Sequence, residues 1–194
     1  KKVLVVGADA RSRFLNPKDH RGMVLFADGA GCVLVEPASR PGLLSIVCDA
    51  EGQEQMGAHI PAGGARRPAS IETVMAGEHY LRVDPKTDIF RMFVSRVTDV
   101  CQRALQQAGL TVDDIDLFLT HQGNGPLIHL AAQALGVRPE AVVDEVAHHG
   151  NTAGASVPIV LDEIVRAGRV RPGSVVLLSA VGAGLTFAAA VHRF

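Results

Sequence analysis

Two short polar stretches carry the residue types that could do chemistry. His121-Gln122-Gly123-Asn124 and His149-Gly150-Asn151-Thr152-Ala153 each follow an apolar, strand-like run and precede a helix-like run. Polar side chains at the ends of buried strands are where open α/β folds keep their ligands and their chemistry. We therefore expect these two loops to carry the functional residues.

His121 and Asn151 are 30 residues apart (151 minus 121), the length of one helix plus one strand, so their loops can emerge at the same sheet edge. A neutral imidazole Nε2–H and an amide NH2 can both donate to one carbonyl oxygen. Two such donors in a dry site stabilise an oxyanion or enolate, and losing one costs about 3 to 4 kcal/mol of transition-state stabilisation. The structural alternative is that His121 caps a helix beginning near Pro126 and Asn151 only makes a turn. The spacing alone does not decide between these interpretations.

Length and composition allow one substantial domain, or part of a larger one, since the chain has 194 residues, of which 47% are hydrophobic. A net charge of -1, one Tyr and no Trp offer nucleic acid neither a basic surface nor stacking groups. Cys32, Cys48 and Cys101 are odd in number and widely spaced, unlike a disulfide framework or a zinc site. We expect a cytoplasmic protein with no bound metal and no nucleic-acid partner.

One segment, Ser174 to Val191, tests the expectation of a soluble protein because it contains no charged residue. It approaches the roughly 18 to 20 residues that span a bilayer. Gly182-Ala183-Gly184 lies in its middle, and β-branched runs flank it, which favours two buried strands joined by a turn. We therefore expect a hairpin and no membrane span.

Strands without helices of their own dominate the first fifty residues. Lys2 to Val6 predicts a strand buried on both faces. Phe26 to Gly31 predicts a tight turn, and strands follow at Cys32 to Glu36 and Leu43 to Cys48. This arrangement suggests that the first forty residues complete a sheet begun upstream of Lys1. Strands such as Cys32 to Val35 and Leu43 to Val47 should otherwise leave unpaired edges or exposed apolar surface.

A long helix follows an irregular segment, Asp49 to Pro85, that shows no sustained periodicity. Thr87 or Asp88 should cap the helix and Gly109 should end it. Cys101 lies on the predicted buried stripe, so we expect it to be a core residue and not a nucleophile. Residues spaced by three and four form this stripe, namely Phe90, Phe93, Val94, Val97, Val100, Cys101, Ala104, Leu105 and Ala108.

Beyond this helix, strands and helices alternate, which predicts a mostly parallel sheet with an antiparallel edge. The expected elements are a strand at 115–120, a helix at 127–135, an extended piece at 141–146, a helix capped by Thr152 or Ser156, and the final hairpin. The second helix should face inward through Val157, Val160, Leu161, Ile164 and Val165. His148 and His149 fit a turn better than a metal site.

The sequence resembles the C-terminal half of a β-ketoacyl-acyl-carrier-protein synthase III, a condensing enzyme of the thiolase fold, over nearly its whole length. That family's His-Gln-Ala-Asn motif appears at 121–124, and its Gly-Asn-Thr-Ser motif appears as Gly150-Asn151-Thr152-Ala153. Phe26 to Gly31 matches a Phe-Gly-Asp-Gly-Ala-Gly motif, and Val181 to Thr186 matches the glycine-rich terminal turn. Four motifs in the right order make the resemblance specific.

For the fold, the resemblance implies an α/β protein with thiolase-like αβαβα layers and a mixed sheet. Residues 1–48 would be the closing strands of the N-terminal thiolase-like half, and residues 49–86 would be an irregular connecting segment. Residues 87–194 would form the C-terminal thiolase-like half. The family precedent also implies a homodimer.

For the chemistry, the resemblance implies separate roles for a nucleophilic cysteine and for a His–Asn pair. In the family, a cysteine takes the acyl group from a thioester, while a His and an Asn hold the carbonyl of a malonyl thioester as it loses CO2. This assigns His121 and Asn151 to the enolate hole and Asn124 to support of the loop. A backbone N–H near Ala183 would contribute to the acyl oxyanion hole. The implied substrates are thioesters of coenzyme A or of acyl-carrier-protein phosphopantetheine, with no permanently bound cofactor.

The family's nucleophilic cysteine has no match among these residues. It lies upstream of the strand that matches Lys2 to Val6, whereas Cys32 and Cys48 fall in predicted strands and Cys101 in a core helix. The resemblance therefore implies that the cysteine and its N-terminal half lie outside this chain. We expect a fragment, a cleaved half or a subunit that another chain completes.

Three departures from the family pattern leave the substrate open. Pro126 occupies the place of an Arg that often faces the carrier or coenzyme A. Val181 replaces a bulky Phe before the terminal turn, which widens the substrate pocket and removes an apolar wall thought to favour decarboxylation. The segment before the long helix reads Val83-Asp84-Pro85 where the family is usually Met-x-Gly-like.

Three hypotheses follow. The leading one is decarboxylative Claisen condensation in fatty acid or polyketide biosynthesis. A second is a relative that passes an acyl group to an amine, a hydroxyl or a second acyl chain without decarboxylation, with His121 as general base. A third is a non-catalytic subunit of a heteromeric synthase. A cysteine upstream at a strand-to-helix junction would favour the two enzymes over the third hypothesis.

Overall fold

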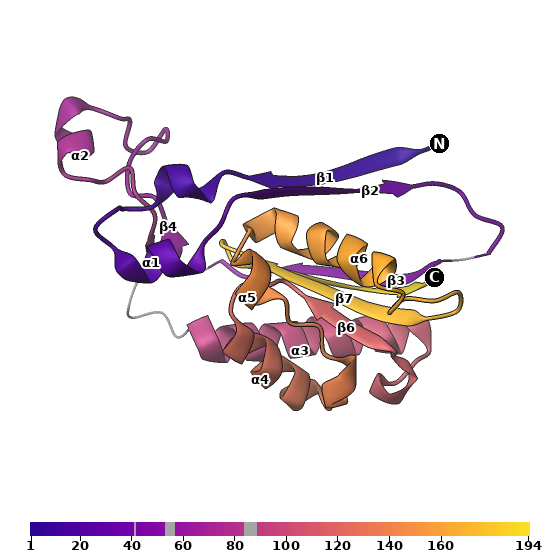
Figure 1. Ribbon diagram of the computed structural model, residues 1–194. Coiled ribbons are helices and arrows are strands. Elements are labelled where there is room, and N and C mark those ends of the chain that lie inside the picture. Colours follow the sequence, from indigo (N-terminus) through magenta and orange to yellow (C-terminus); the bar gives the residue numbers. More distant parts are fainter. Residues whose placement is uncertain (41, 53–56, 84–88) are drawn as a thin grey trace.

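The computed structural model describes residues 1–40, 42–52, 57–83 and 89–194 (Figure 1). The predicted helix caps Thr87 and Asp88, the side chain of Phe90 and most of the Val83-Asp84-Pro85 segment lie outside the described part.

A four-stranded mixed sheet lies at the centre of the molecule. Its strand order is β3 (Leu43–Ala50), β8 (Thr186–Arg193), β7 (Val175–Gly182) and β6 (Leu117–Thr120). In the described residues β6 and β7 are parallel, whereas the β7–β8 and β8–β3 pairs are antiparallel. The mixed sheet is confirmed, but the expectation that it is mostly parallel is wrong.

The extended piece expected at 141–146 is not a strand. Residues Pro139–Ala141 form a 3₁₀ turn (η3), and a helix, α5 (Val146–His149), begins five residues later. Between them only Val142 pairs with β6, through a single parallel bridge to Phe118. His148 and His149 therefore lie on a short helix and not on a turn.

Helices cover both faces of this sheet (Figure 1). The long helix α3 (Ile89–Ala108) and α4 (Gly125–Leu135) lie on one face, and α6 (Ser156–Arg166) lies on the other. Because strand side chains alternate between faces, Phe118 packs in the α3–α4 core while its neighbours Leu117 and Leu119 pack with α6. The sheet thus separates two cores.

The helix α3 has the predicted buried stripe over its described side chains. Phe93, Val97, Val100, Cys101, Ala104 and Leu105 are buried, with Val94 and Ala108 partly buried against them. Gly109 follows with a left-handed φ of 68°, which ends the helix as expected. Cys101 is fully buried, and this burial raises the pKa of its thiol to about 12. Its assignment to the core is confirmed.

The helix α6 departs from the prediction at its start and on one face. Neither Thr152 nor Ser156 caps it, because a 3₁₀ turn, η4 (Ala153–Ala155), runs directly into its first turn. Val160 and Ile164 are buried as expected. Val165 is 43% exposed because it follows Ile164 by one residue and points away from the buried face.

A separate two-stranded antiparallel sheet, β1 (Val3–Asp9) and β2 (Gly29–Val35), lies on the outer side of α6 (Figure 1). Gly29 to Gly31 belong to β2 and not to a turn, which corrects the prediction. Glycine lets β2 approach α6 closely, since a Cβ at Gly31 would lie 3.0 Å from the backbone nitrogen of Ile159.

Apolar side chains of β1 are exposed, so the expected burial of both its faces is wrong for the described chain. Val3, Leu4, Val5 and Val6 are each more than half exposed. The expected exposed apolar surface is confirmed on the two other early strands, at Leu34, Val35, Leu43 and Ile46.

The division at residue 48 also needs correction. Strand β3 pairs with β8 from Leu43 to Ala50, so it belongs to the central sheet with the C-terminal strands. The remaining boundaries stay predictions.

Shorter elements complete the fold. They are η1 (Arg11–Phe14), α1 (His20–Leu25), β4 (Ala58–His59), α2 (Ile71–Met75), β5 (Arg82–Val83) and η2 (Val112–Asp114). The helix α2 and the paired strands β4 and β5 lie within the segment that was expected to be irregular, and the backbone N–H of Leu81 donates to the carbonyl of Phe14 at 2.7 Å. The predicted hairpin at 174–191 is confirmed as β7 and β8. Among the described residues, no helix has the length and apolar character to cross a membrane.

Candidate active site

The loop after β6 begins with His121, which the sheet holds in place. Its backbone N–H donates to the carbonyl of Ser179 on β7 at 2.9 Å, so the parallel pairing continues one residue past the strand. Just before it, the buried Thr120 accepts a hydrogen bond from the Ser179 hydroxyl at 2.7 Å. The position of the imidazole is therefore set by the end of the central sheet.

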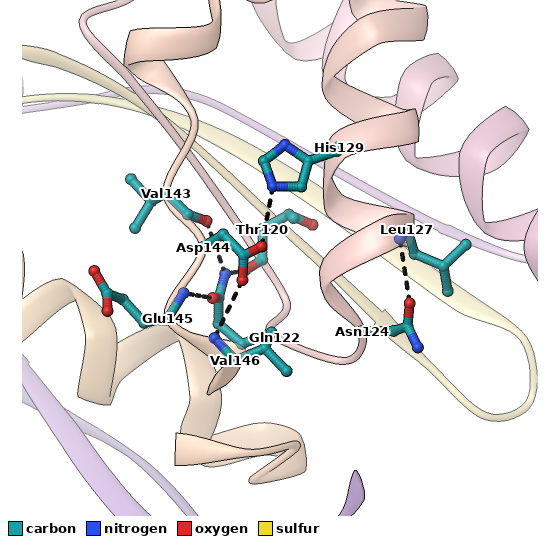
Figure 2. Close-up of polar contacts among 9 residues, drawn as sticks. All are labelled: Thr120, Gln122, Asn124, Leu127, His129, Val143, Asp144, Glu145 and Val146. Atoms are coloured by element: carbon teal, nitrogen blue, oxygen red, sulfur yellow. Dashed lines mark hydrogen bonds and ion pairs between the residues drawn. The ribbon is translucent and has the colours of Figure 1, made fainter. Parts of the chain in front are cut away.

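Gln122 braces this loop against the one that leads to α5 (Figure 2). Its fully buried amide donates to the carbonyls of Thr120 at 2.8 Å and Val143 at 3.2 Å. Its Oε1 accepts from the backbone N–H of Glu145 at 2.7 Å. Both ends of the amide are satisfied, as burial requires.

Asn124 caps α4, as Figure 2 shows: its Oδ1 accepts from the backbone N–H of Leu127 at 3.3 Å. Because Asn124 is the N-cap, the alternative in which His121 caps this helix is wrong. Pro126 lies in the first turn of α4 and is exposed.

The second loop is tied to the segment that enters β2. The backbone N–H of Asn151 donates to Leu25 at 2.8 Å, and the N–H of Ala27 donates back to Asn151 at 3.0 Å. The Oδ1 of Asn151 accepts from the N–H of Ala153 at 3.0 Å, so this residue does make a local turn contact. Its Nδ2 makes a long contact of 3.4 Å with the carbonyl of Gly123, which directs the amide NH2 toward the first loop.

His121 and Asn151 come together around Gly123. A Cβ placed on Gly123 would lie 2.9 Å from His121 Nε2 and 3.6 Å from Asn151 Nδ2. The two nitrogens are therefore at most 6.5 Å apart, the sum of these two distances, and both residues line the same cavity. A single oxygen atom could accept hydrogen bonds from both groups.

Ser156 holds the other side of the imidazole and was missed as a site residue. Its Oγ lies 2.8 Å from His121 Nδ1 and accepts from the backbone N–H of Gln122 at 3.3 Å. With that N–H donating to it, the hydroxyl can donate to Nδ1, which leaves the imidazole proton on Nε2. Ser156, Val160 and Ile164 are spaced by four and lie on the same buried face of the helix. A hydroxyl on a buried face needs a hydrogen-bond partner, and this spacing could have identified Ser156 from the sequence.

Burial is the largest cause of the perturbed electrostatics of His121. Burial and, second to it, the positive charge of Arg11 lower the pKa of the imidazole to about 4. The backbone of Ala153 and the carboxylate of Asp9 act in the opposite direction. His121 is therefore a neutral imidazole across roughly pH 5 to 8.

This shift makes a pH prediction. We expect the His121 ring signals to titrate near pH 4 in an NMR titration, instead of near the ordinary value of about 6.5. Between these values the unfolded chain binds a proton at this residue and the folded chain does not, so the free energy of unfolding should fall as the pH drops from 6.5 to 4. A His121→Gln variant assigns the signal, and a midpoint close to 6.5 would contradict the buried site.

A cavity of about 640 Å³ opens beside these groups. His121, Asn124 and Asn151 line it together with Arg11, Val181 and Ala183. Ala183 lies in the turn between β7 and β8, where the resemblance places an oxyanion-hole N–H. Pro126, expected in the substrate pocket, is exposed at the start of α4 and is not among the lining residues of this cavity, so its place beside the substrate stays a prediction.

None of the three cysteines, all in the described part, lines the cavity: Cys32 and Cys48 are on strands and Cys101 is in the core. The two neighbouring histidines pair with carboxylates, His148 with Glu145 at 2.7 Å and His149 with Glu163 at 2.8 Å. Across residues 1–40, 42–52, 57–83 and 89–194 no group of three His, Cys, Asp or Glu side chains could hold a metal ion.

Comparison with known families agrees with this arrangement. Residues 105–194 match the family described as 3-oxoacyl-[acyl-carrier-protein (ACP)] synthase III C terminal, and residues 1–52 match 3-oxoacyl-[acyl-carrier-protein (ACP)] synthase III. The chain belongs to the 3-oxoacyl-ACP synthase III family. The resemblance inferred from the four motifs is confirmed.

Individual 3-oxoacyl-ACP synthase III relatives are longer than this chain. It is 40% identical to a β-ketoacyl-ACP synthase III of Symbiobacterium thermophilum, over 98% of this chain and 58% of the relative. It is also 40% identical to a 3-oxopimeloyl-ACP synthase of Rhodothermus marinus, over 99% of this chain and 56% of the relative. The chain thus spans between half and two thirds of the length of these relatives.

The crystal structure of β-ketoacyl-ACP synthase III from Thermus thermophilus superimposes with a TM-score of 0.87 at 37% identity. The match covers 100% of this chain and 59% of that protein. The layers described above, two-stranded sheet, α6, central sheet and α3–α4, are therefore part of the thiolase-like αβαβα fold. This confirms the predicted fold class.

Proposed function

We propose that this chain provides the enolate-stabilising part of a 3-oxoacyl-ACP synthase III active site, which forms a carbon–carbon bond by decarboxylative Claisen condensation. The proximity of His121 Nε2 and Asn151 Nδ2, which lie within 6.5 Å of each other (2.9 Å plus 3.6 Å from one position at Gly123) on the wall of one cavity, carries the proposal. The nucleophilic cysteine belongs to a segment outside residues 1–194. The enzyme works on fatty acid or polyketide precursors, in the cytoplasm and as a homodimer.

Two half-reactions follow from these roles. First, the cysteine thiolate attacks the carbonyl of an acyl thioester, and the thiol of coenzyme A or of the carrier's phosphopantetheine leaves with a proton. A backbone N–H in the turn around Ala183 donates to the oxyanion of this step. Second, the malonyl thioester loses CO2, and the electron pair of the broken bond becomes an enolate that attacks the acyl-cysteine carbonyl and expels the thiolate.

The protein contributes to the second half-reaction by stabilising negative charge on the enolate oxygen. Donors fixed in a buried site before the reaction need no reorganisation as the charge develops. His121 suits this role because it is neutral and because Ser156 favours the tautomer with the proton on Nε2. A protonated Nε2 donates but does not accept, which favours decarboxylative condensation over transfer with His121 as general base.

The names of the relatives leave the acyl donor open. One is a β-ketoacyl-ACP synthase III, and the other is a 3-oxopimeloyl-ACP synthase, whose named product carries an acyl chain ending in a carboxylate. Val181 on the cavity wall, in place of a bulky Phe, leaves room for acyl groups of either kind.

The complete enzyme, including the segment with the cysteine, tests the proposal. Incubation with an acyl-CoA and a malonyl thioester labelled at its free carboxyl should release labelled CO2 and yield a 3-oxoacyl product detectable by mass spectrometry. Transfer of the acyl group to an amine or hydroxyl without CO2 release would favour the non-decarboxylating acyltransferase. Absence of both acylation and CO2 release would favour a non-catalytic subunit.

Removing the Ser156 hydroxyl should slow condensation through His121. Ser156→Ala leaves Nδ1 without a donor, so part of the population shifts its proton from Nε2 to Nδ1, and we expect turnover to fall about tenfold. Ser156→Thr keeps a hydroxyl and should recover most of the rate at equal thermal stability. If both variants lost the same activity, a packing role would explain Ser156 better than positioning of the imidazole.

A further inference from the structure

Among the residues that the structure describes, Arg11 is the one Arg or Lys that lines the cavity beside the proposed enolate site. Arg11, at the start of η1, lines the same cavity as His121 and Asn151. After burial, its positive charge is the largest influence that lowers the pKa of His121. The guanidinium is therefore electrostatically coupled to the groups that would hold the substrate.

The nearest carboxylate only partly satisfies Arg11. Asp9 accepts a hydrogen bond from the backbone N–H of Gly154 through Oδ2 at 2.9 Å. Its Oδ1 lies 3.6 Å from Arg11 Nε, which is an ion pair but too long for a hydrogen bond. Within the described part of the chain, the buried Nε of Arg11 has no hydrogen-bond partner.

The surroundings make such a guanidinium costly unless a ligand completes its hydrogen bonds. Leu25, Phe26 and Val157 are among the residues that line the cavity with Arg11. The Arg11 side chain as a whole is 34% exposed, but its Nε is buried, and buried polar groups are normally hydrogen-bonded. The planar fork of an arginine matches a carboxylate, which can accept two parallel N–H bonds.

We propose that Arg11 binds a carboxylate at the far end of the acyl group, so that the enzyme accepts thioesters of dicarboxylic acids. This inference rests on the proposed function and names the substrate class of that same cavity. The thioester end of the acyl group lies toward His121 and Asn151, and the free carboxylate lies on Arg11. A monocarboxylic acyl chain leaves the guanidinium without its partner.

Two five-carbon probes test the pairing in the complete enzyme. Glutaryl-CoA ends in a carboxylate, and pentanoyl-CoA ends in a methyl group. Acylation of the cysteine, followed by mass spectrometry, should show a kcat/KM for glutaryl-CoA well above that for pentanoyl-CoA. Arg11→Leu should lower the value for glutaryl-CoA by about 10- to 100-fold, as expected for loss of a charged hydrogen bond. It should raise the value for pentanoyl-CoA, because the pocket becomes apolar.

Arg13→Leu is the matched control, because Arg13 is an exposed arginine of the same 3₁₀ turn that does not line the cavity. It should leave the ratio between the two probes unchanged. The inference is overturned if the wild-type enzyme prefers pentanoyl-CoA, or if Arg11→Leu lowers acylation by both probes equally. Because acylation is measured without malonyl thioester, a failure of condensation alone would count against the proposed function and not against this pairing.

Discussion

Alanine in place of His121 should lower the turnover of condensation by about 100- to 1000-fold, the usual cost of losing one fixed donor to a developing oxyanion. The imidazole lies at the end of β6, and its Nε2 and Asn151 Nδ2 lie close to Gly123, in residues that line the same cavity. In the parent enzyme, Nδ1 of His121 is hydrogen-bonded to Ser156, so Nε2 is the ring nitrogen that can donate to the substrate. The remaining donor, Asn151, cannot replace it.

The measurement separates the two half-reactions. Release of CO2 from a malonyl thioester by the acylated His121→Ala enzyme should show the full loss, whereas loading of the cysteine should be affected far less. His129→Ala is a suitable control, since this histidine is exposed on α4 and pairs with Asp144 at 3.0 Å (Figure 2). A normal rate of CO2 release by His121→Ala would contradict the assignment of His121 to the enolate hole.

The location of this pair was predictable from sequence because local patterns determine it. An apolar run followed by polar residues and a helix-starting proline predicted that His121 ends a strand, and β6 ends at Thr120. The period of three and four in α3 and the glycine-rich turn between β7 and β8 are equally local. In each case, the residues that set the element are its own members or immediate neighbours.

The residues that were missed depend on packing between distant segments. Ser156 contacts His121 only because η4 and α6 fold back over the end of β6, 35 residues away in sequence. Arg11 reaches the cavity from a 3₁₀ turn that is separated from His121 by most of the chain. Neither contact has a sequence period or motif of its own, so single-sequence reasoning assigned Ser156 to a helix cap and gave Arg11 no role.

The prediction of a mostly parallel sheet was wrong for a similar reason. Alternating helices and strands after residue 88 predicted parallel pairing, which holds for β6 and β7. However, β3 precedes the irregular segment and still pairs with β8, a partner about 140 residues later. An alternation rule applied within one stretch of chain does not report a strand that joins the sheet from outside that stretch.

Aspartate in place of Asn151 should have the larger effect on condensation, about 1000-fold or more. The side chain keeps its size, and its Oδ1 can still accept from the N–H of Ala153, so the local turn should persist. The second oxygen replaces Nδ2, so it faces the carbonyl of Gly123 and the cavity that Asn151 lines. A donor is thus lost, and a negative charge is placed beside a developing negative charge.

The charge gives this variant a second signature that loss of structure would not produce. A carboxylate next to the imidazole stabilises the imidazolium, so the pKa of His121 should rise from about 4 in Asn151→Asp. Asn151→Ala removes the donor without adding charge and should lose less activity, about 100-fold. Asn16→Asp is the matched control away from the cavity, because the Oδ1 of Asn16 accepts a local hydrogen bond from the N–H of Lys18 at 3.0 Å, which an aspartate can also accept. If Asn151→Asp and Asn151→Ala were equally impaired and His121 titrated as in the parent enzyme, the amide would not share an oxyanion with the imidazole.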